Sequence, residues 1–253
     1  MSKCDYVLGT QEDEVERLGL QHRVWRRHVL DGWTTAGIAP GMTVIDVGAG
    51  PGFAATDLAE IVGPDGRVIA LERSPNFLQS LQDRAGRLGL ANIEARSHDV
   101  SEAGFGADIA DASWCRWLLS FVTDPAATVR HIAEALKPGG VAVFHEYADY
   151  GAWRTMPPNP DVERFRDLAI RSWRDSGGEP DIALRLPGML KAAEWRSSPL
   201  ARSWRSSGRA TSPGAGRPRS WPSTPPGSAS SAMPMPTRRR ASPRPSTIAR
   251  TTP

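Results

Sequence analysis

The stretch VIDVGAGPG, at residues 44–52, decides the fold of this chain. It begins as an apolar run, which is typical of a buried strand, and continues into a glycine-rich turn that leads into a helical pattern. Glycines let the backbone of such a turn approach a ligand closely and direct amide groups at it. Because position 53 is Phe, the third glycine of the dinucleotide fingerprint G-x-G-x-x-G is absent. Asp46, just before the glycines, suits an ammonium or sulfonium cation better than a pyrophosphate.

Short apolar runs alternate with helical patterns outward from this turn. A helix with one apolar face precedes the turn, and Thr10 with Asp13 is expected to cap it. The alternation predicts an α/β fold, a Rossmann-like doubly wound parallel sheet. The expected strands are 43–47, 68–71, 93–95, 109–115 and 141–145, and the later helices are 53–62, 75–88, 125–136, 161–176 and 182–195.

Charge divides the chain into two parts. Of its 31 basic side chains, 11 are arginines between Arg196 and the C-terminus, a segment without Asp or Glu. Residues 1–195 therefore hold 20 basic and 28 acidic side chains, a net charge of −8, although the whole chain carries +3. This acidic body argues against a nucleic-acid duplex as substrate, since phosphate binding needs clustered Lys and Arg.

Composition also bears on location. No apolar run approaches the roughly 20 residues of a membrane span, and the acidic N-terminal segment is unlike a signal peptide. The two cysteines, Cys4 and Cys115, are too few for a disulfide framework. We expect a cytoplasmic protein with no membrane partner, and the oligomeric state stays open.

Three acidic residues recur at nearly equal intervals. Asp46, Glu72 and Asp99 are 26 and 27 residues apart, about one strand–helix unit each, which predicts that all three lie at the ligand-binding edge of the sheet. Glu72 would accept hydrogen bonds from ribose hydroxyls, and Asp99 from an exocyclic amine such as that of adenine. Because no His or Cys stands at ligand spacing beside them, no metal site is expected.

Residues 44–52, Glu72, Asp99 and the segment LKPGG at 136–140 together resemble the class I S-adenosylmethionine-dependent methyltransferases. The chain is most similar to the small-molecule group around the ubiquinone/menaquinone-biosynthesis C-methyltransferases. The resemblance implies S-adenosyl-L-methionine as cofactor, with its methionine part at the glycine turn, its ribose at Glu72 and its adenine at Asp99. The cofactor-binding residues that it implies are Asp46, Gly48, Ala49, Gly50, Gly52, Glu72, Arg73, Asp99, Val100, Cys115 and Arg116.

Methyl transfer from a sulfonium is an in-line displacement, for which a protein must align donor and acceptor in a dry pocket. A base is needed only if the acceptor loses a proton, and the catalytic residue stays open. The candidates are His145, Glu146 and Tyr147, although a packed core histidine is the simpler interpretation of His145. The expected acceptor is a small molecule, aromatic or isoprenoid-linked. Four tryptophans would suit either its pocket or the core, namely Trp33, Trp117, Trp153 and Trp173.

The family completes its sheet with two further strands after the helix that ends near residue 194, and here neither has a candidate. We expect a methyltransferase domain at 1–195 with its last two strands missing, and a disordered Arg/Pro/Ser-rich tail at 196–253. A reading-frame shift near residues 193–197 would explain the tail, because the tail replaces core strands. The alternatives are a real basic tail that binds nucleic acid, on a fold with impaired catalysis, and an NAD(P)-binding Rossmann protein.

Overall fold

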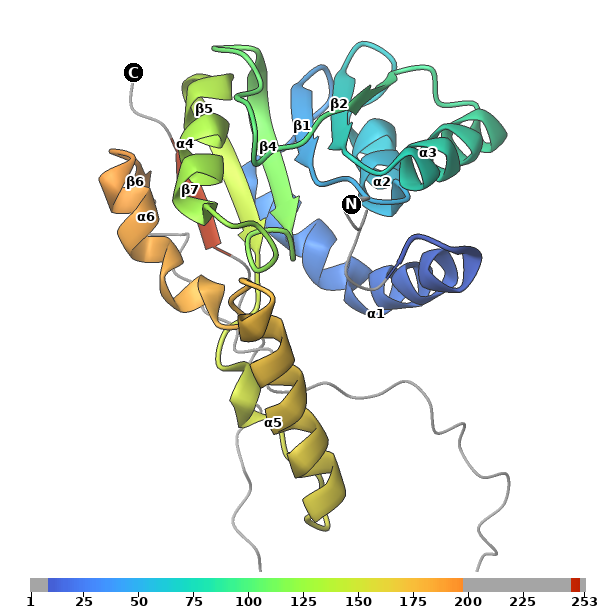
Figure 1. Ribbon diagram of the computed structural model, residues 1–253. Helices are drawn as coiled ribbons and strands as arrows, with labels where there is room; N and C mark the ends of the chain where they lie inside the picture. Colours follow the sequence, from blue (N-terminus) through green and yellow to red (C-terminus); the bar gives the residue numbers. More distant parts are fainter. Residues whose placement is uncertain (1–8, 198–246, 251–253) are drawn as a thin grey trace, which may run out of the picture.

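The computed structural model describes residues 9–197 and 247–250. Its centre is a sheet with the strand order β3-β2-β1-β4-β5-β7-β6 (Figure 1). The first five strands in this order are parallel, which confirms the predicted α/β fold. The strands are β1 (Thr43–Val47), β2 (Arg67–Glu72), β3 (Ile93–Ser97), β4 (Ala110–Arg116), β5 (Leu136–His145), β6 (Arg196–Ser197) and β7 (Thr247–Arg250).

Helices cover both faces of the sheet. On one face, α1 (Glu12–Ala36), α2 (Phe53–Val62) and α3 (Pro75–Leu88) bury one hydrophobic cluster. On the other face, α4 (Pro125–Ala135) and α6 (Leu186–Ala192) bury a second cluster. The helix α5 (Pro160–Asp175) projects beyond the edge of the sheet (Figure 1). Short 3-10 helices at Tyr150–Ala152 and Ile182–Leu184 lie before and after α5 in the chain.

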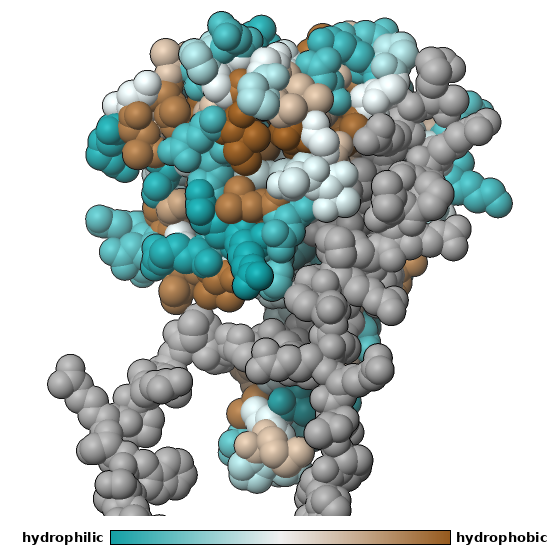
Figure 2. Space-filling view, turned by 180° about the vertical axis from the view of Figure 1, so that it is seen from behind, coloured by the Kyte–Doolittle hydropathy of each residue, from teal (hydrophilic) through white to brown (hydrophobic). Residues whose placement is uncertain are grey.

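The surface of the described residues mixes polar and apolar side chains. Figure 2 shows hydrophilic and hydrophobic residues interspersed over the sheet-bearing part of the molecule, seen from behind. On the projecting helix α5, Phe165 and Leu168 are 66% and 49% exposed. In the described part of the chain, no helix is long and apolar enough to cross a membrane.

Local chemistry explains why two of these helices match their predicted bounds. The hydroxyl of Ser74 accepts a hydrogen bond from the Phe77 backbone N–H at 3.4 Å, and proline occupies the first turn of α3. Gly89 ends α3 with a left-handed φ of 67°, a conformation that glycine adopts without a steric penalty. Gly52, the residue before α2, has a left-handed conformation too, with φ 81°.

Strand register brings the predicted functional residues to one edge. Asp46 of β1 lies opposite Ala70 of β2 and Trp114 of β4. Glu72 is the last residue of β2, and Arg116 is the last residue of β4. Since these strands are parallel, their carboxyl ends form the edge where open α/β sheets bind ligands.

The cap of α1 differs from the prediction. Gln11, and not Thr10, occupies the N-cap position, and no side chain caps the helix there. The Thr10 hydroxyl instead accepts a hydrogen bond from the Asn76 side-chain amide at 2.9 Å. The predicted capping side chain therefore bonds to α3 instead of to its own helix, and such a contact between distant segments cannot be read from the local sequence.

The prediction that the last two strands are missing was wrong. The segment Thr247–Arg250, from the end of the tail, forms β7 and pairs antiparallel with β5, and β6 pairs with β7. The edge of β5 carries backbone groups that need partners, and a segment with the β-branched residues Thr247 and Ile248 is suited to pair with it. The predicted disorder of the remaining tail lies outside the described residues.

Candidate functional site

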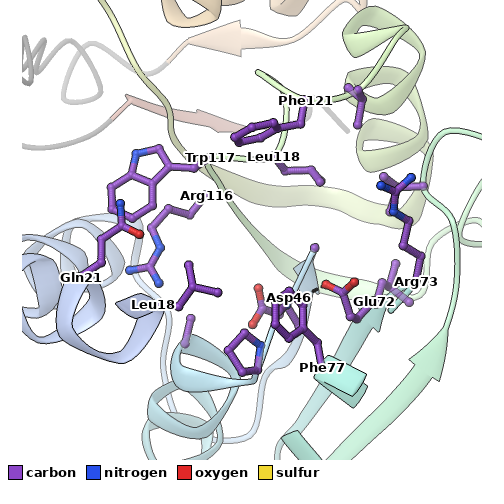
Figure 3. Close-up of a pocket in the computed structure, with 18 of the residues that line it drawn as sticks. Leu18, Gln21, Asp46, Glu72, Arg73, Phe77, Arg116, Trp117, Leu118 and Phe121 are labelled. Carbon is purple, nitrogen blue, oxygen red and sulfur yellow. Dashed lines mark hydrogen bonds between the residues drawn. The ribbon is translucent and has the colours of Figure 1, made fainter. Parts of the chain in front are cut away.

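A cavity of about 560 Å³ opens at the carboxyl edge of the parallel strands. Figure 3 shows Asp46 and Glu72 entering it from the sheet, Gln21 from α1, and Trp117 and Phe121 from the segment after β4. Nine of the eleven cofactor-binding residues predicted from the sequence line this cavity. They are Asp46, Gly48, Ala49, Gly50, Glu72, Arg73, Asp99, Val100 and Arg116.

The glycine turn is shaped by contacts on both of its sides. A side chain at Gly48 would place its Cβ 2.9 Å from Leu118, and one at Gly52 would place it 2.5 Å from Leu81. Both glycines also have positive φ values, 73° and 81°, so substitution there is strained. Gly50 has φ 55°, and among the described residues a Cβ atom there would have no neighbour within 4 Å, so this part of the structure leaves open space beside it. Gly52 is not in the cavity wall, and its role is to seat α2 against α3.

Asp46 is a buried carboxylate with an unmet hydrogen bond. The residue is 2% exposed, and among the described residues its Oδ2 atom has no hydrogen-bond partner. Burial raises the pKa of Asp46 to about 7, although the positive charge of Arg116 lowers it and the negative charge of Glu72 raises it further. An unpaired buried carboxylate is costly, and a cationic ligand in the cavity would supply the missing partner.

Glu72 ties the glycine turn to the end of β2. One carboxylate oxygen accepts from the Gly50 N–H at 2.9 Å, and the other accepts from the Ser74 N–H at 2.8 Å. Burial raises the pKa of Glu72 despite these two hydrogen bonds. Because each carboxylate oxygen has a second lone pair, Glu72 keeps capacity to accept from hydroxyl groups of a ligand in the cavity.

Asp99 and Val100 line the cavity beyond Glu72. The Asp99 carboxylate accepts from the Ser101 N–H at 2.9 Å, and the Arg73 guanidinium lies 3.7 Å from its other oxygen. Phe77 of α3 adds apolar surface to the cavity lining near Glu72 (Figure 3). A carboxylate and an apolar ring in one lining are suited to a planar base with an exocyclic amine.

Arg116 enters the cavity from the end of β4 and contacts α1. Both terminal nitrogens of its guanidinium lie 3.2 Å from Nδ1 of His22. Its guanidinium carbon is also 4.9 Å from the ring centre of Trp117. Burial lowers the pKa of Arg116 to about 10, opposed by the carboxylate of Asp46, so the side chain is charged at neutral pH.

Four aromatic rings form the wall opposite the glycine turn. Trp117 stacks on Tyr147 at 5.4 Å between ring centres, and Phe121 stacks on Trp173 at 4.7 Å. Tyr147 meets Trp173 edge to face at 5.6 Å. Trp117 and Trp173 are thus the two predicted tryptophans that line the cavity. The other two do not line it, because Trp33 is buried in the core and Trp153 lies outside the wall.

Cys115 requires a correction. Successive residues of a strand point to opposite faces of the sheet, and Trp114 and Arg116 line the cavity, whereas Cys115 is buried in the cluster beneath α4 and α6. Burial raises the pKa of its thiol well above the ordinary value. Cys115 is therefore a core residue, and it does not line the cavity as the predicted cofactor-binding role requires.

Among the three candidate bases, the structure brings only Tyr147 to the cavity. The ring of His145 packs against Trp25 at 5.2 Å and Trp117 at 5.1 Å. The Tyr147 hydroxyl accepts a hydrogen bond from the Gln21 amide at 3.4 Å. Tyr147 is thus the one candidate of the three that lines the cavity.

Glu146 anchors the loop after β4, which carries two rings of the aromatic wall, Trp117 and Phe121. One of its oxygens accepts from the N–H groups of Leu118 and Leu119, both at 2.9 Å, and the other accepts from the Ser120 hydroxyl at 3.2 Å. Burial raises the pKa of Glu146 to about 7. The contacts point to a supporting role, which local sequence does not reveal because the partners are 26 or more residues away.

Comparison with known proteins gives one family. A family model described as "Methyltransferase domain" matches residues 38–169. The 2-phytyl-1,4-naphtoquinone methyltransferase of Synechococcus elongatus is 31% identical over 153 residues, which are 60% of this chain and 61% of that protein. The ubiquinone/menaquinone biosynthesis C-methyltransferase UbiE of Pseudomonas putida is 30% identical over 131 residues, 51% of this chain and 50% of that protein. The chain thus spans about half to three fifths of these curated relatives.

Solved structures share the fold at lower identity. The YcgJ protein of Bacillus subtilis matches with a TM-score of 0.51 at 20% identity, covering 65% of this chain and 66% of that one. The [4+2]-cyclase SpnF matches with a TM-score of 0.52 at 19% identity, covering 68% of this chain and 58% of that one. At this identity, the likeness extends to the fold alone.

Proposed function

This chain belongs to the class I S-adenosylmethionine-dependent methyltransferases, and we propose that it transfers a methyl group from S-adenosylmethionine to a small aromatic acceptor. One observation carries the proposal. The glycine turn, Asp46, Glu72 and Asp99 meet along one side of a cavity whose opposite wall is aromatic. The groups of the first side are complementary to a nucleoside that carries an amino acid, and the aromatic wall is complementary to a planar ring.

The residues of the first side fit the cofactor. The unpartnered Oδ2 of Asp46 would pair with the ammonium group of the methionine part. Glu72 would accept hydrogen bonds from the ribose hydroxyls, and Asp99 would accept one from the adenine amine. The open space beside Gly50 leaves room for the ligand against the turn.

The chemical requirement on the protein is modest. When bound, the cofactor supplies an electrophilic methyl group on a sulfonium sulfur. The chain's own residues would align the acceptor with that methyl group and exclude water, which is the main contribution of a protein to such a displacement. If the acceptor must lose a proton, we propose Tyr147 for that step in preference to His145 and Glu146, since it alone of the three lines the cavity.

The aromatic wall supports a ring-shaped acceptor. Trp117 and Tyr147 are stacked with an interplanar angle of 10°, which presents a flat surface beside Arg116. Offset stacking on such rings favours planar aromatic ligands. The names of the relatives from Synechococcus elongatus and Pseudomonas putida specify naphthoquinone- and ubiquinone-type compounds, and we propose an acceptor of this chemical class.

A transfer assay tests the proposed function. The protein would be incubated with S-adenosylmethionine labelled on its methyl group and with a panel of reduced naphthoquinones, benzoquinols and simple phenols. We expect label in at least one small molecule, and less label with Tyr147→Phe, which keeps the stacked ring but removes the hydroxyl. Label in tRNA or protein, with none in any small molecule, would overturn the proposed acceptor.

A further inference from the structure

Two opposite charges enter the cavity from neighbouring strands without forming an ion pair. Asp46 of β1 and Arg116 of β4 both line it (Figure 3). Within the described residues, the Arg116 guanidinium has no carboxylate oxygen within 4.0 Å. It contacts the His22 ring and lies over the rings of Trp114 and Trp117. In the same part of the chain, Asp46 has one oxygen without a partner. Each charge is therefore available to a ligand.

Arg116 is held by a hydrogen-bonded relay that runs outward through α1 and α2. A guanidinium only donates hydrogen bonds, so the Nδ1 atom of His22 must be the acceptor, 3.2 Å away. The proton of the neutral ring then lies on Nε2, which donates to the Asp57 carboxylate at 3.0 Å. Asp57 also accepts from Arg26, from Nε at 2.8 Å and from a terminal nitrogen at 3.1 Å.

This arrangement orients Arg116 without neutralising it. The neutral His22 ring accepts the two guanidinium contacts but brings no negative charge to them. Asp57, which does carry charge, is separated from Arg116 by the imidazole. A guanidinium has five N–H donors, so donors remain for an oxyanion in the cavity.

We propose that Asp57 and His22 are positioning residues that hold Arg116 apart from Asp46, so that the two charges together receive an α-amino-acid zwitterion. The ammonium of the ligand pairs with Asp46, and its carboxylate pairs with Arg116. This inference rests on the proposed function, because the ligand is the methionine part of the cofactor. It explains why a cationic and an anionic side chain enter one cavity without meeting.

Comparing the binding of two adenosine ligands distinguishes loss of the zwitterion contacts from general damage to the site. S-adenosylhomocysteine carries the zwitterion, whereas 5′-methylthioadenosine keeps the adenosine and the sulfur but has no amino acid group. In calorimetric titrations, we expect Arg116→Gln to weaken S-adenosylhomocysteine binding by about tenfold or more, the usual effect of losing a charge-assisted hydrogen bond. Binding of 5′-methylthioadenosine should change by less than about twofold.

The relay is tested by Asp57→Asn. This change keeps the side-chain shape but weakens the hold on His22, and we expect a several-fold loss for S-adenosylhomocysteine with 5′-methylthioadenosine again unchanged. Glu60→Gln is the matched control. Glu60 is an exposed carboxylate on α2, the helix that also carries Asp57, but it is Asp57 that bonds to His22. The control should alter neither affinity.

The outcomes are distinct. Equal losses for both ligands, or no loss for either, in Arg116→Gln would overturn the zwitterion receptor. An Asp57→Asn protein that matches Glu60→Gln would overturn the relay. If Arg116→Gln fails to fold, Arg116→Lys allows the same comparison, since lysine keeps the charge but not the two contacts to His22. Failure of the unaltered protein to bind either ligand would instead refute the proposed function.

Discussion

The buried carboxylate of Asp46 should make the protein less stable at high pH than it would be with a neutral side chain. Burial raises the pKa of Asp46 from its ordinary value of 3.8 to about 7 in the folded protein. The unfolded chain therefore loses this proton at lower pH than the folded chain does. Stability falls as pH rises from about 4 to about 7, and the full cost is present above pH 7.

The replacement Asp46→Asn measures this cost. Each pH unit of difference between the two pKa values corresponds to about 1.4 kcal/mol, so the variant should gain on the order of 4 kcal/mol at pH 8. At pH 5 the gain should be less than half of that, because the folded wild-type side chain is already protonated. For a domain of this size, the gain at pH 8 corresponds to a rise in Tm of about 8 to 16 °C.

Thermal unfolding of both proteins at pH 5 and pH 8, without ligand, would give the two differences. Asp108→Asn is a suitable control, because Asp108 is an exposed aspartate and its replacement removes the same charge. The reasoning is refuted if Asp46→Asn gains no more at pH 8 than at pH 5, or if the variant is less stable than the wild type at pH 8.

Three further predictions concern the support of the site and the end of the chain. Glu146→Ala leaves the N–H groups of Leu118, which is partly buried, and Leu119, which is buried, without their acceptor, so urea unfolding should show a free energy of unfolding lower by about 2–4 kcal/mol; Glu146→Gln keeps one acceptor oxygen and should lose clearly less, and equal losses would contradict the anchoring role. Truncation after residue 197 removes β7 and exposes the edge of β5, so light scattering should show self-association that the full chain does not show; a monomeric truncated protein would contradict this. The reading-frame shift near residues 193–197 stays a prediction although β6 and β7 pair beside β5, because these strands hold only two and four residues; another frame of the gene should encode alternating Val/Ile/Leu-rich segments sufficient for two longer strands, and if no frame does so, the hypothesis fails.

Local chemistry was sufficient to predict much of the fold. The helices α2 and α3 have the predicted bounds, since glycine, serine and proline mark their ends. The spacing of Asp46, Glu72 and Asp99 predicted one shared edge, because parallel strands bring their carboxyl ends together, and all three line the cavity. The alternation of strands and helices was therefore sufficient to predict both the parallel sheet and the residues of one side of the candidate site.

Contacts between distant segments could not be predicted in this way. His22 and Arg116 are 94 residues apart, and the apolar helical face around His22 indicates only packing. For Cys115, a signal was available: strand alternation places it on the face opposite Arg116, so both could not line one cavity. The pairing of β7 with β5 depends on an open strand edge, a tertiary feature that the composition of the tail does not indicate.

The most direct test of the central claim is a calorimetric titration of the unaltered protein with S-adenosylhomocysteine and, separately, with NADH. We predict that S-adenosylhomocysteine binds at one site per chain and that NADH does not bind. Glu72→Ala should weaken the S-adenosylhomocysteine affinity by about 1–3 kcal/mol, from the loss of hydrogen bonds to a charged acceptor. Binding of NADH, with none of S-adenosylhomocysteine, would contradict the proposed cofactor.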